Sequence, residues 1–237
     1  MALRQPVDGE SYIVQRTDQT TMWEGYEFGR PLINNEWIED FNYFQATDWT
    51  ITESDAAATE ALATAAPTVG GVLLITNTNA DDNAVSMQKV GHSFIPTVGT
   101  NIWFECRLQA SEATQCDWLV GLVITDTTPL AHADGIVFRK DDGDTQIDFE
   151  TTNGSASSSE TSIGTFAATT YVTVGFKITG TTSVEYFVNG VSQGTLTTRI
   201  PTAPLRPTIH FQDGDTAAAL AALTMSVDYI MCSQTRV

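Results

Sequence analysis

The sequence predicts an all-β fold: a jelly-roll β-sandwich of two antiparallel sheets with an irregular N-terminal arm. Three observations support this. About a dozen short strand-like runs follow one another closely, several of them alternate apolar and polar residues, and Asp-Gly or Asn-Gly pairs stand between some of them. Few segments favour a helix. In a chain of 237 residues this pattern is typical of one large all-β domain, or of a core domain with an extension.

The middle of the chain carries the clearest strand pattern. Ile102–Leu108 alternates apolar and polar side chains, as a strand with one dry face does. Asp117–Thr125 is apolar nearly throughout, which is typical of a strand buried on both faces. Gly135–Lys140 and Thr145–Thr151 flank the turn DDGD, a strong hairpin signal because glycine reaches positive φ without steric cost.

Strands are also predicted before and after this region, and a second hairpin turn is predicted at Asn189-Gly190. The expected strands are Trp49–Ile51, Val72–Thr76, Tyr171–Thr179, Val184–Val188, Val191–Leu196, Thr208–Gln212 and Leu223–Cys232. Ala56–Ala66 has a helix-favouring composition but also alternates, so an edge strand stays open. Asn153–Glu160 is expected to be an exposed low-complexity loop, and Ala217–Ala222 a loop or a single helical turn.

The N-terminal segment, residues 1–45, differs from the expected jelly-roll domain, residues 46–237, because it is dense in aromatic residues and lacks a long periodic pattern. So many rings cannot stay in water. They pack either along their own domain or on a neighbouring subunit or another protein, where aromatic rings serve as anchors. The candidate interaction residues are Trp23, Tyr26, Phe28, Trp37 and Phe41 of the arm, together with Trp103 of the domain.

The charge balance limits the partners of this chain. It has 11 Lys and Arg against 29 Asp and Glu, a net charge of −18. Such a charge repels phosphate backbones and anionic membrane surfaces, so neither nucleic acid nor membrane is an expected partner. The N-terminus shows no secretion signal, and no apolar run reaches transmembrane length. The three cysteines, Cys106, Cys116 and Cys232, are expected to be free, buried thiols of a protein made in a reducing cytoplasm.

No cofactor, metal or catalytic site is predicted from motifs. His92, His132 and His210 lack zinc-like spacing, and no nucleophile elbow or phosphate-binding glycine loop is present. Two acidic clusters could offer oxygen ligands to calcium, but hairpin geometry explains the first and neither has EF-hand spacing. These clusters are Asp141, Asp142 and Asp144, and Asp81, Asp82 and Asn83.

Several segments, taken in order, are similar to the concanavalin A-like lectin and glucanase jelly roll, which also occurs in laminin G-like domains. They are the run Gly70–Thr76, FECRLQAS, DWLVGLVITD, DGIVFRKDDGD, YVTVGFKIT, VEYFVNGV and the terminal LTMSVDYI. The resemblance covers roughly residues 49–237 and leaves the arm outside. The style of DGIVFRKDDGD with a C-terminal MSVDYI also resembles tailed-phage proteins that decorate or cement a capsid.

The resemblance implies where glycanase chemistry would lie. Glycanases of this superfamily use an E-x-D-x-E strand, in which the first Glu is the nucleophile and the last is the acid and base. The nearest match here is Gln146-Ile147-Asp148-Phe149-Glu150, which has Gln in the first position. A carboxamide cannot form the glycosyl ester, and positions four apart on a strand lie roughly 13 Å from each other, against roughly 5 Å in a retaining pair. We therefore expect no enzymatic activity.

The function predicted from the sequence is that of a non-enzymatic phage virion structural protein. It would be a capsid decoration or cement protein that binds the major capsid protein and its own copies, with a trimer as one option, and stabilises the shell. It would be made in the host cytoplasm and end on the capsid surface of the virion. The alternative is a glycan-binding, lectin-like module of a phage fibre or adhesin. In that case Trp103 could face outward, whereas Trp118 belongs to the core.

Overall fold

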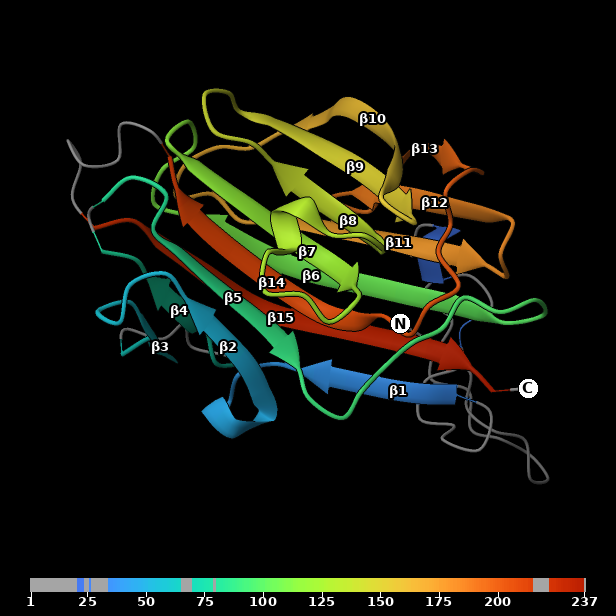
Figure 1. Ribbon diagram of the computed structural model, residues 1–237, viewed down its shortest axis with the longest axis horizontal. Coiled ribbons are helices and arrows are strands. Elements are labelled where there is room, and N and C mark those ends of the chain that lie inside the picture. Colours follow the sequence, from blue (N-terminus) through green and yellow to red (C-terminus); the bar gives the residue numbers. More distant parts are fainter. Residues whose placement is uncertain are drawn as a thin grey trace, which may run out of the picture.

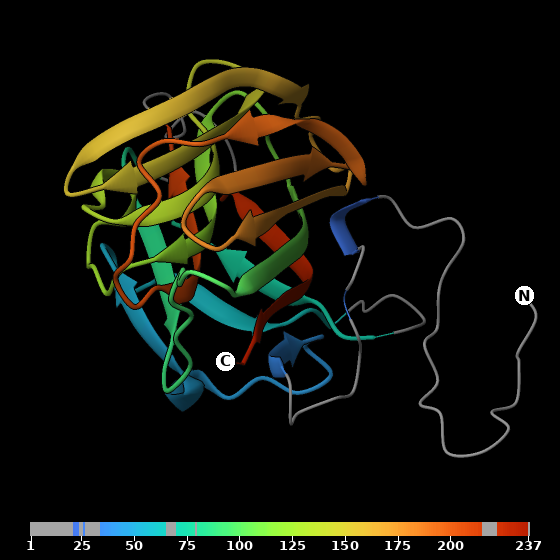
Figure 2. The ribbon, with the colours of Figure 1, turned by 90° about the vertical axis from the view of Figure 1, so that its right-hand side faces the viewer.

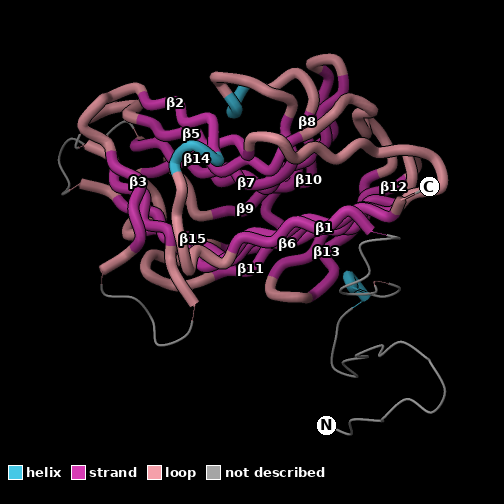
Figure 3. Tube along the Cα trace, turned by 90° about the horizontal axis from the view of Figure 1, so that it is seen from below, coloured by secondary structure: helices cyan, strands magenta, loops and turns pink. Residues whose placement is uncertain are grey.

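The computed structural model describes residues 21–23, 26, 34–64, 70–78, 80–214 and 222–236. In these residues the chain forms two antiparallel sheets that stack face to face, which confirms the predicted jelly-roll sandwich (Figure 3). Three short 3-10 turns accompany the strands: η1 (Thr21–Trp23), η2 (Ala46–Asp48) and η3 (Pro129–Ala131). Within the described residues, no helix is long and apolar enough to cross a membrane.

One layer, here called the β6 sheet, has the strand order β13-β12-β11-β6-β15-β4-β3, and β1 also pairs with β15. Its strands are β13 (Val191–Leu196), β12 (Ser183–Val188), β11 (Val172–Thr179), β6 (Asn101–Ala110), β15 (Thr224–Thr235), β4 (Leu73–Thr76), β3 (Thr59–Leu62) and β1 (Asn34–Glu39). The arm therefore adds one strand to this layer.

The other layer, here called the β7 sheet, has the order β10-β9-β8-β7-β14-β5-β2, which Figure 1 shows from top to bottom. Its strands are β10 (Ala156–Thr165), β9 (Gln146–Asn153), β8 (Gly135–Lys140), β7 (Cys116–Val123), β14 (Arg206–Asp213), β5 (Ala84–Lys89) and β2 (Trp49–Glu53). Every residue of β7 is buried, as its continuous apolar run predicts.

The core lies between the two layers and is rich in aromatic rings. Phe149 of β9 stacks on Tyr186 of β12 with ring centroids 4.5 Å apart, and Phe104 of β6 lies 4.8 Å from Phe176 of β11. Phe138 joins the two pairs, at 4.8 Å from Phe149. This cluster sits directly beneath the outward side chains of β8 and β9, so it gives those strands a rigid support.

Both predicted hairpin turns are confirmed. Gly143 between β8 and β9 has φ +86°, and Asn189 and Gly190 between β12 and β13 have φ +49° and +75°. Two such residues in the left-handed region are what a type I′ turn requires, because its twist matches that of the flanking strands. The hairpin at Gly143 fixes the register that sets Arg139 opposite Asp148.

The structure decides the secondary structure of two segments that the sequence left open or predicted wrongly. Within Ala56–Ala66 the edge-strand alternative is correct, since Thr59–Leu62 forms β3 and pairs with β4. The prediction of a loop at Asn153–Glu160 is wrong, because most of it belongs to β10, which pairs with β9. Gly154 and Ser155, with φ +60° and +62°, make the tight turn between these strands, and the serines that follow pair along β9. Of Ala217–Ala222, all but the last residue lie outside the described residues.

All three cysteines are free and buried, as expected from the sequence. Burial raises the pKa of the Cys116 thiol to about 12, and it raises the pKa of Cys106 and Cys232 well above the ordinary range. A buried thiol with a raised pKa is a poor nucleophile, so these residues act as small apolar side chains.

Candidate functional site

The strand that the glycanase resemblance singled out is β9, and its side chains alternate between two environments. Ile147 and Phe149 enter the core, whereas Asp148 and Glu150 point to the outer side of the β7 sheet. On neighbouring strands the register sets Arg139 opposite Asp148 and Ser159 opposite Glu150. We call the outward side chains at this place the β9 face; they are Arg139, Asp148, Glu150, Thr152 and Ser157.

Glu150 is the centre of the β9 face. Its Oε1 accepts hydrogen bonds from the hydroxyls of Thr152, at 2.7 Å, and Ser157, at 3.0 Å. Its Oε2 lies 3.7 Å from Nη1 of Arg139, and Oε1 lies 3.8 Å from Nε2 of His132. The side chain keeps 15% of its surface exposed. The carboxylate is thus oriented by two hydroxyls and a guanidinium, lies beside the His132 ring, and is still reachable from solvent.

Arg139 is held by the hairpin that follows it. Its Nε donates to Oδ1 of Asp141 at 2.8 Å, and its Nη2 lies 2.7 Å from the same oxygen. Its Nη1 also reaches the carbonyl oxygen of Leu130 at 3.5 Å. With one side of the guanidinium fixed in this way, Nη1 is directed toward Glu150 and can donate to an oxygen of a ligand bound there.

Asp148 is the second carboxylate on this side of β9. Its Oδ1 accepts the backbone N–H of Ser162 at 2.7 Å. Ser162 lies in the irregular stretch of β10, where the register with β9 shifts between Glu160 and Gly164, and it has φ +58°. The bond therefore ties the bulge in the edge strand to the acidic strand beside it.

A loop between β7 and β8, residues 124–134, covers the part of the sheet next to the β9 face. The N–H of Ile124 donates to the carbonyl of Asp134 at 2.9 Å, which closes the loop at its base. Asp134 Oδ1 accepts the N–H of Gly154 at 3.0 Å, so the loop is also tied to the β9–β10 turn. Leu130 packs on an apolar patch of the sheet made by Leu119, Val123 and Val137.

His132 enters the site from this loop. Its Nδ1 is 2.7 Å from the carbonyl oxygen of Pro129, which can only accept, so Nδ1 carries a proton. The ring lies over Gly135, where a Cβ would come within 2.5 Å of Cδ2 and 2.6 Å of Nε2. Only 1% of the side chain is exposed, and Nε2 has no hydrogen-bond partner in the structure. This nitrogen faces Glu150.

The other half of this sheet side is closed to ligands. Ser86 Oγ lies 2.6 Å from Nδ1 of His210, and Gln88 Nε2 donates to Thr208 Oγ1 at 3.0 Å. Burial lowers the pKa of His210 to about 4, with Gln212 partly opposing the shift, so the ring is neutral near pH 7. All four paired residues are buried, and they hold β5 to β14.

The two acidic clusters considered for calcium make other contacts. Asp141 binds Arg139, Asp144 accepts the N–H of Gln146 at 2.7 Å, and the N–H of Asp142 donates to Asp117 at 2.7 Å. Asp82 accepts a hydrogen bond from Gln212 at 2.7 Å. Within the described residues, no group of three or more His, Cys, Asp or Glu is arranged to hold a metal ion.

The aromatic candidates for an interaction surface lie on the outside of the β6 sheet or in the core. Trp23 of η1 donates its indole N–H to Glu105 Oε2 at 3.0 Å, and the Tyr26 ring lies 5.1 Å from that of Trp103, which it covers. Figure 2 shows η1, in blue, beside the strands of the β6 sheet. Trp37 and Phe41 pack around Trp49 in the core. Phe28 lies outside the described residues. A role of these rings in binding a partner stays a prediction, as do the capsid partner, the oligomer and the virion location.

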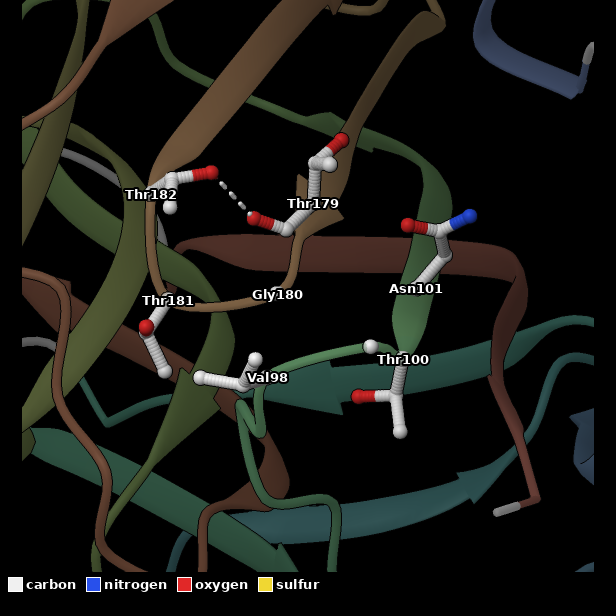
Figure 4. Close-up of a pocket in the computed structure, with 8 residues that line it drawn as sticks. Val98, Thr100, Asn101, Thr179, Gly180, Thr181 and Thr182 are labelled. Atoms are coloured by element: carbon white, nitrogen blue, oxygen red, sulfur yellow. Dashed lines mark hydrogen bonds between the residues drawn. The ribbon is translucent and has the colours of Figure 1, made fainter.

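A shallow depression of about 220 Å³ lies at one end of the sandwich, between the start of β6 and the turn after β11 (Figure 4). Thr182 donates its hydroxyl to the carbonyl of Thr179 at 2.9 Å within its wall. Its lining holds no titratable side chain; the residues are Val98, Gly99, Thr100, Asn101, Thr179, Gly180, Thr181 and Thr182. The depression therefore lacks charged groups like those that surround Glu150.

The fold is similar to solved structures of enzymes that act on carbohydrates. A β-glucanase from Bacillus licheniformis is 16% identical with a TM-score of 0.60, over 83% of this chain and 97% of that chain. A lichenase from a mouse hindgut metagenome is 12% identical with a TM-score of 0.61, over 83% and 98% of the two chains. An endo-1,3-β-glucanase from Streptomyces sioyaensis is 14% identical with a TM-score of 0.57, over 85% and 96%. No protein-family model and no curated protein matches the chain.

These comparisons define the class of the fold as the concanavalin A-like jelly roll, as predicted. They also correct the functional prediction. The solved structures named above are glycoside hydrolases, which contradicts the prediction of a non-enzymatic capsid decoration protein and the prediction that the chain is no enzyme. The prediction relied on the style of the DGIVFRKDDGD segment, which in the structure is a β8–β9 hairpin whose residues are accounted for by turn geometry and the Arg139–Asp141 contact.

The sequence pattern indicates β9 but not most of the β9 face. His132 and Arg139 lie 18 and 11 positions before Glu150 in the chain, and Ser157 was placed in a loop. The DDGD hairpin signal could have placed Arg139 beside Asp148, since a turn of known length fixes which residues pair. No sequence signal indicates that the loop of His132 folds back over the sheet.

Proposed function

We propose that this chain is a carbohydrate-active protein that binds a glycan on the β9 face, with Glu150 as the central contact. The observation that carries the proposal is the set of neighbours at Glu150: Thr152 and Ser157 orient one carboxylate oxygen, and Arg139 stands beside the other. Sugars offer hydroxyl groups that both donate and accept hydrogen bonds. A partly exposed carboxylate can accept a hydrogen bond from a sugar hydroxyl, and the guanidinium beside it can donate one to a sugar oxygen.

The fold and the position on it support the same proposal. The solved structures named above include enzymes described as β-glucanases, and β9 is the strand that the glycanase resemblance marks in this sequence. The strand β10 adds a row of exposed hydroxyl groups beside the carboxylate, from Ser157 and Ser159. Binding of a β-glucan chain along β8, β9 and β10 is thus the function that the geometry supports best.

Bond cleavage is a second candidate, favoured by one observation. Asp148 and Glu150 lie two positions apart on the same side of one strand, a spacing of roughly 7 Å. This is near the roughly 6.5–9.5 Å of an inverting pair of carboxylates and exceeds the roughly 5 Å of a retaining pair. The general acid of such a pair needs an apolar or like-charged setting that keeps its proton on. The neighbours of Glu150 are instead two hydroxyls, an arginine and a histidine, so binding ranks ahead of cleavage.

Titration calorimetry of the chain with soluble mixed-linkage β-glucan, laminarin and xylan tests the proposal. We expect one of these neutral polymers to bind, and Glu150→Gln to weaken the affinity about tenfold, because a charge-assisted hydrogen bond is lost. The matched control is Glu160→Gln on the exposed edge strand, which should leave affinity unchanged. Release of reducing ends by the wild type, abolished in both Asp148→Asn and Glu150→Gln, would establish cleavage. Equal affinity of wild type and Glu150→Gln for the bound glycan would overturn the assignment of the face.

A further inference from the structure

His132 has one ring nitrogen anchored by a hydrogen bond, while the other is buried without a hydrogen-bond partner. One side of its ring is fixed by the bond from Nδ1 to the Pro129 carbonyl, 2.7 Å long, and its flat face rests on Gly135. The other side ends in Nε2, which is buried and has no hydrogen-bond partner. A buried polar atom without a partner is costly, and in a native protein it needs an explanation.

The group that Nε2 faces is the carboxylate of Glu150, with 3.8 Å between Nε2 and Oε1. Two states of the ring give opposite interactions at this distance. Without a proton, Nε2 presents a lone pair to a carboxylate that also carries lone pairs, and the two repel. With a proton, the ring is a cation that attracts the carboxylate. The attraction is strong because the ring is buried from water. The proton on Nδ1 is present in both states.

The surroundings of His132 indicate that Glu150 is the group affected by the proton on Nε2. Among the charged groups held against loop 124–134, Arg139 of β8 contacts Oε2 of Glu150, and Asp134 is bound by the N–H of Gly154. The strand β14 packs on η3 and contributes His210, which is neutral because burial lowers its pKa to about 4. The strand β7 contributes apolar side chains beneath the loop. Glu150 is thus the anion that lies nearest to Nε2.

We propose that His132 is a positioning residue for Glu150, and that the proton on Nε2 decides whether the carboxylate is held in place. Histidine is the side chain whose charge ordinarily changes between pH 5 and 8, so the β9 face is held at the lower end of this range and loosened at the upper end. The glycan consequence rests on the function proposed above. The contact between His132 and Glu150 does not, and it can be measured without a glycan.

The ligand-free test is a titration of the His132 ring nitrogens by long-range ¹H–¹⁵N spectroscopy on the full chain. We expect the wild type to keep the proton on Nε2 more tightly than Glu150→Gln, because the variant removes the opposing charge. The matched control is Glu160→Gln, which removes the same charge from an exposed place and should leave the titration unchanged. A His132 titration that is identical in wild type and Glu150→Gln overturns the proposal.

Two substitutions of His132 separate its two nitrogens. His132→Asn keeps a donor near Nδ1 for the Pro129 carbonyl but is too short to reach Glu150. His132→Gln places an amide donor near Nε2 that carries no charge at any pH. With soluble mixed-linkage β-glucan as the probe, the wild type should bind about fivefold more tightly at pH 5.5 than at pH 8. His132→Gln should bind equally at both pH values and tightly, and His132→Asn equally and weakly.

The outcomes distinguish the two proposals. If His132 only supports the loop, both variants should bind glucan more weakly but keep the difference in affinity between pH 5.5 and pH 8, here called the pH step. That result would overturn the positioning role. His92→Asn, a change of the same residue type beside Trp37, should keep the step. If the wild type binds no glucan while the ring titration responds to Glu150→Gln, the glycan function fails and the positioning role stands. If glucan binds equally to the wild type and both His132 variants, the positioning role fails and the glycan function stands.

Discussion

The imidazole of His132 occupies the space that a side chain on Gly135 would need. A Cβ built on Gly135 would lie 2.5 Å from Cδ2 of His132 and 2.6 Å from Nε2. Gly135 is the first residue of β8 and has no positive φ, so the reason for glycine here is the close approach of the ring and not the backbone conformation.

Gly135→Ala should therefore displace His132 and loosen loop 124–134. We expect a loss of about 1–3 kcal/mol in the free energy of unfolding, as for overpacking in a tight place, measured by urea denaturation. The matched control is Gly164→Ala on β10, whose Cβ would meet only the ends of two side chains, Val188 at 3.2 Å and Ile147 at 3.5 Å. Equal losses in the two variants would show that His132 is not confined by Gly135.

The contact of η1 with the β6 sheet rests on Glu105. Its Oε2 accepts the indole N–H of Trp23 at 3.0 Å, and its Oε1 accepts the hydroxyl of Tyr229 at 2.7 Å. Glu105→Gln keeps an acceptor for Trp23 but removes the negative charge that strengthens both hydrogen bonds, and its NH2 faces the Tyr229 hydroxyl as a donor, so unfolding should become easier by about 1–3 kcal/mol. Guanidinium denaturation followed by tryptophan fluorescence measures this. Glu160→Gln, in an exposed place, should change stability by about 0.5 kcal/mol or less; a similar small effect at Glu105 would refute the role of this contact.

Buried carboxyl groups make the stability of the chain depend on pH. Burial raises the pKa of Asp213 from 3.8 to about 6, with the hydrogen bond from Asn77 partly opposing the shift. A raised folded pKa means that the folded state holds the proton more tightly. The stabilisation that protonated Asp213 gives to the folded state is therefore fully present below pH 3.8 and is lost as the pH rises to about 6.

Asp213→Asn removes this loss, because the amide stays neutral and still accepts from Asn77. Relative to wild type, the variant should gain about 2 kcal/mol of stability between pH 4 and pH 7, with most of the change below pH 6.5. Chemical denaturation of both proteins at a series of pH values gives the difference. Parallel stability curves would mean that Asp213 is not desolvated in the folded protein.

Much of the fold follows from local patterns in the sequence. The alternation in Ile102–Leu108 and the apolar run of Asp117–Thr125 correspond to β6 and β7, because one strand has a half-polar outer side and the other is buried on both sides. The Asn189-Gly190 turn was readable because only a few residue types reach positive φ cheaply. Trp118 lies in the core, as predicted.

What the sequence did not reveal depends on contacts between distant segments. The strand β10 is rich in serine and exposed, so its pairing with β9 leaves no hydrophobic signature. His132 reaches Glu150 only because its loop folds back and is tied at Asp134. Trp103 points away from the core, as its alternation suggested, and is nonetheless covered by Tyr26 of the arm. Polar patterning alone cannot place such a cover.

The most direct test of the central claim is to locate the glycan on the protein by amide hydrogen exchange, with and without soluble mixed-linkage β-glucan. We expect slower exchange in β9 and β10 and in loop 124–134, with β13 and the turn after β11 unchanged. The Glu150→Gln variant should lose this protection at the same glucan concentration. Protection at the depression around Val98 and Thr181, or on the outer side of the β6 sheet, with none at Glu150, would contradict the assignment of the β9 face.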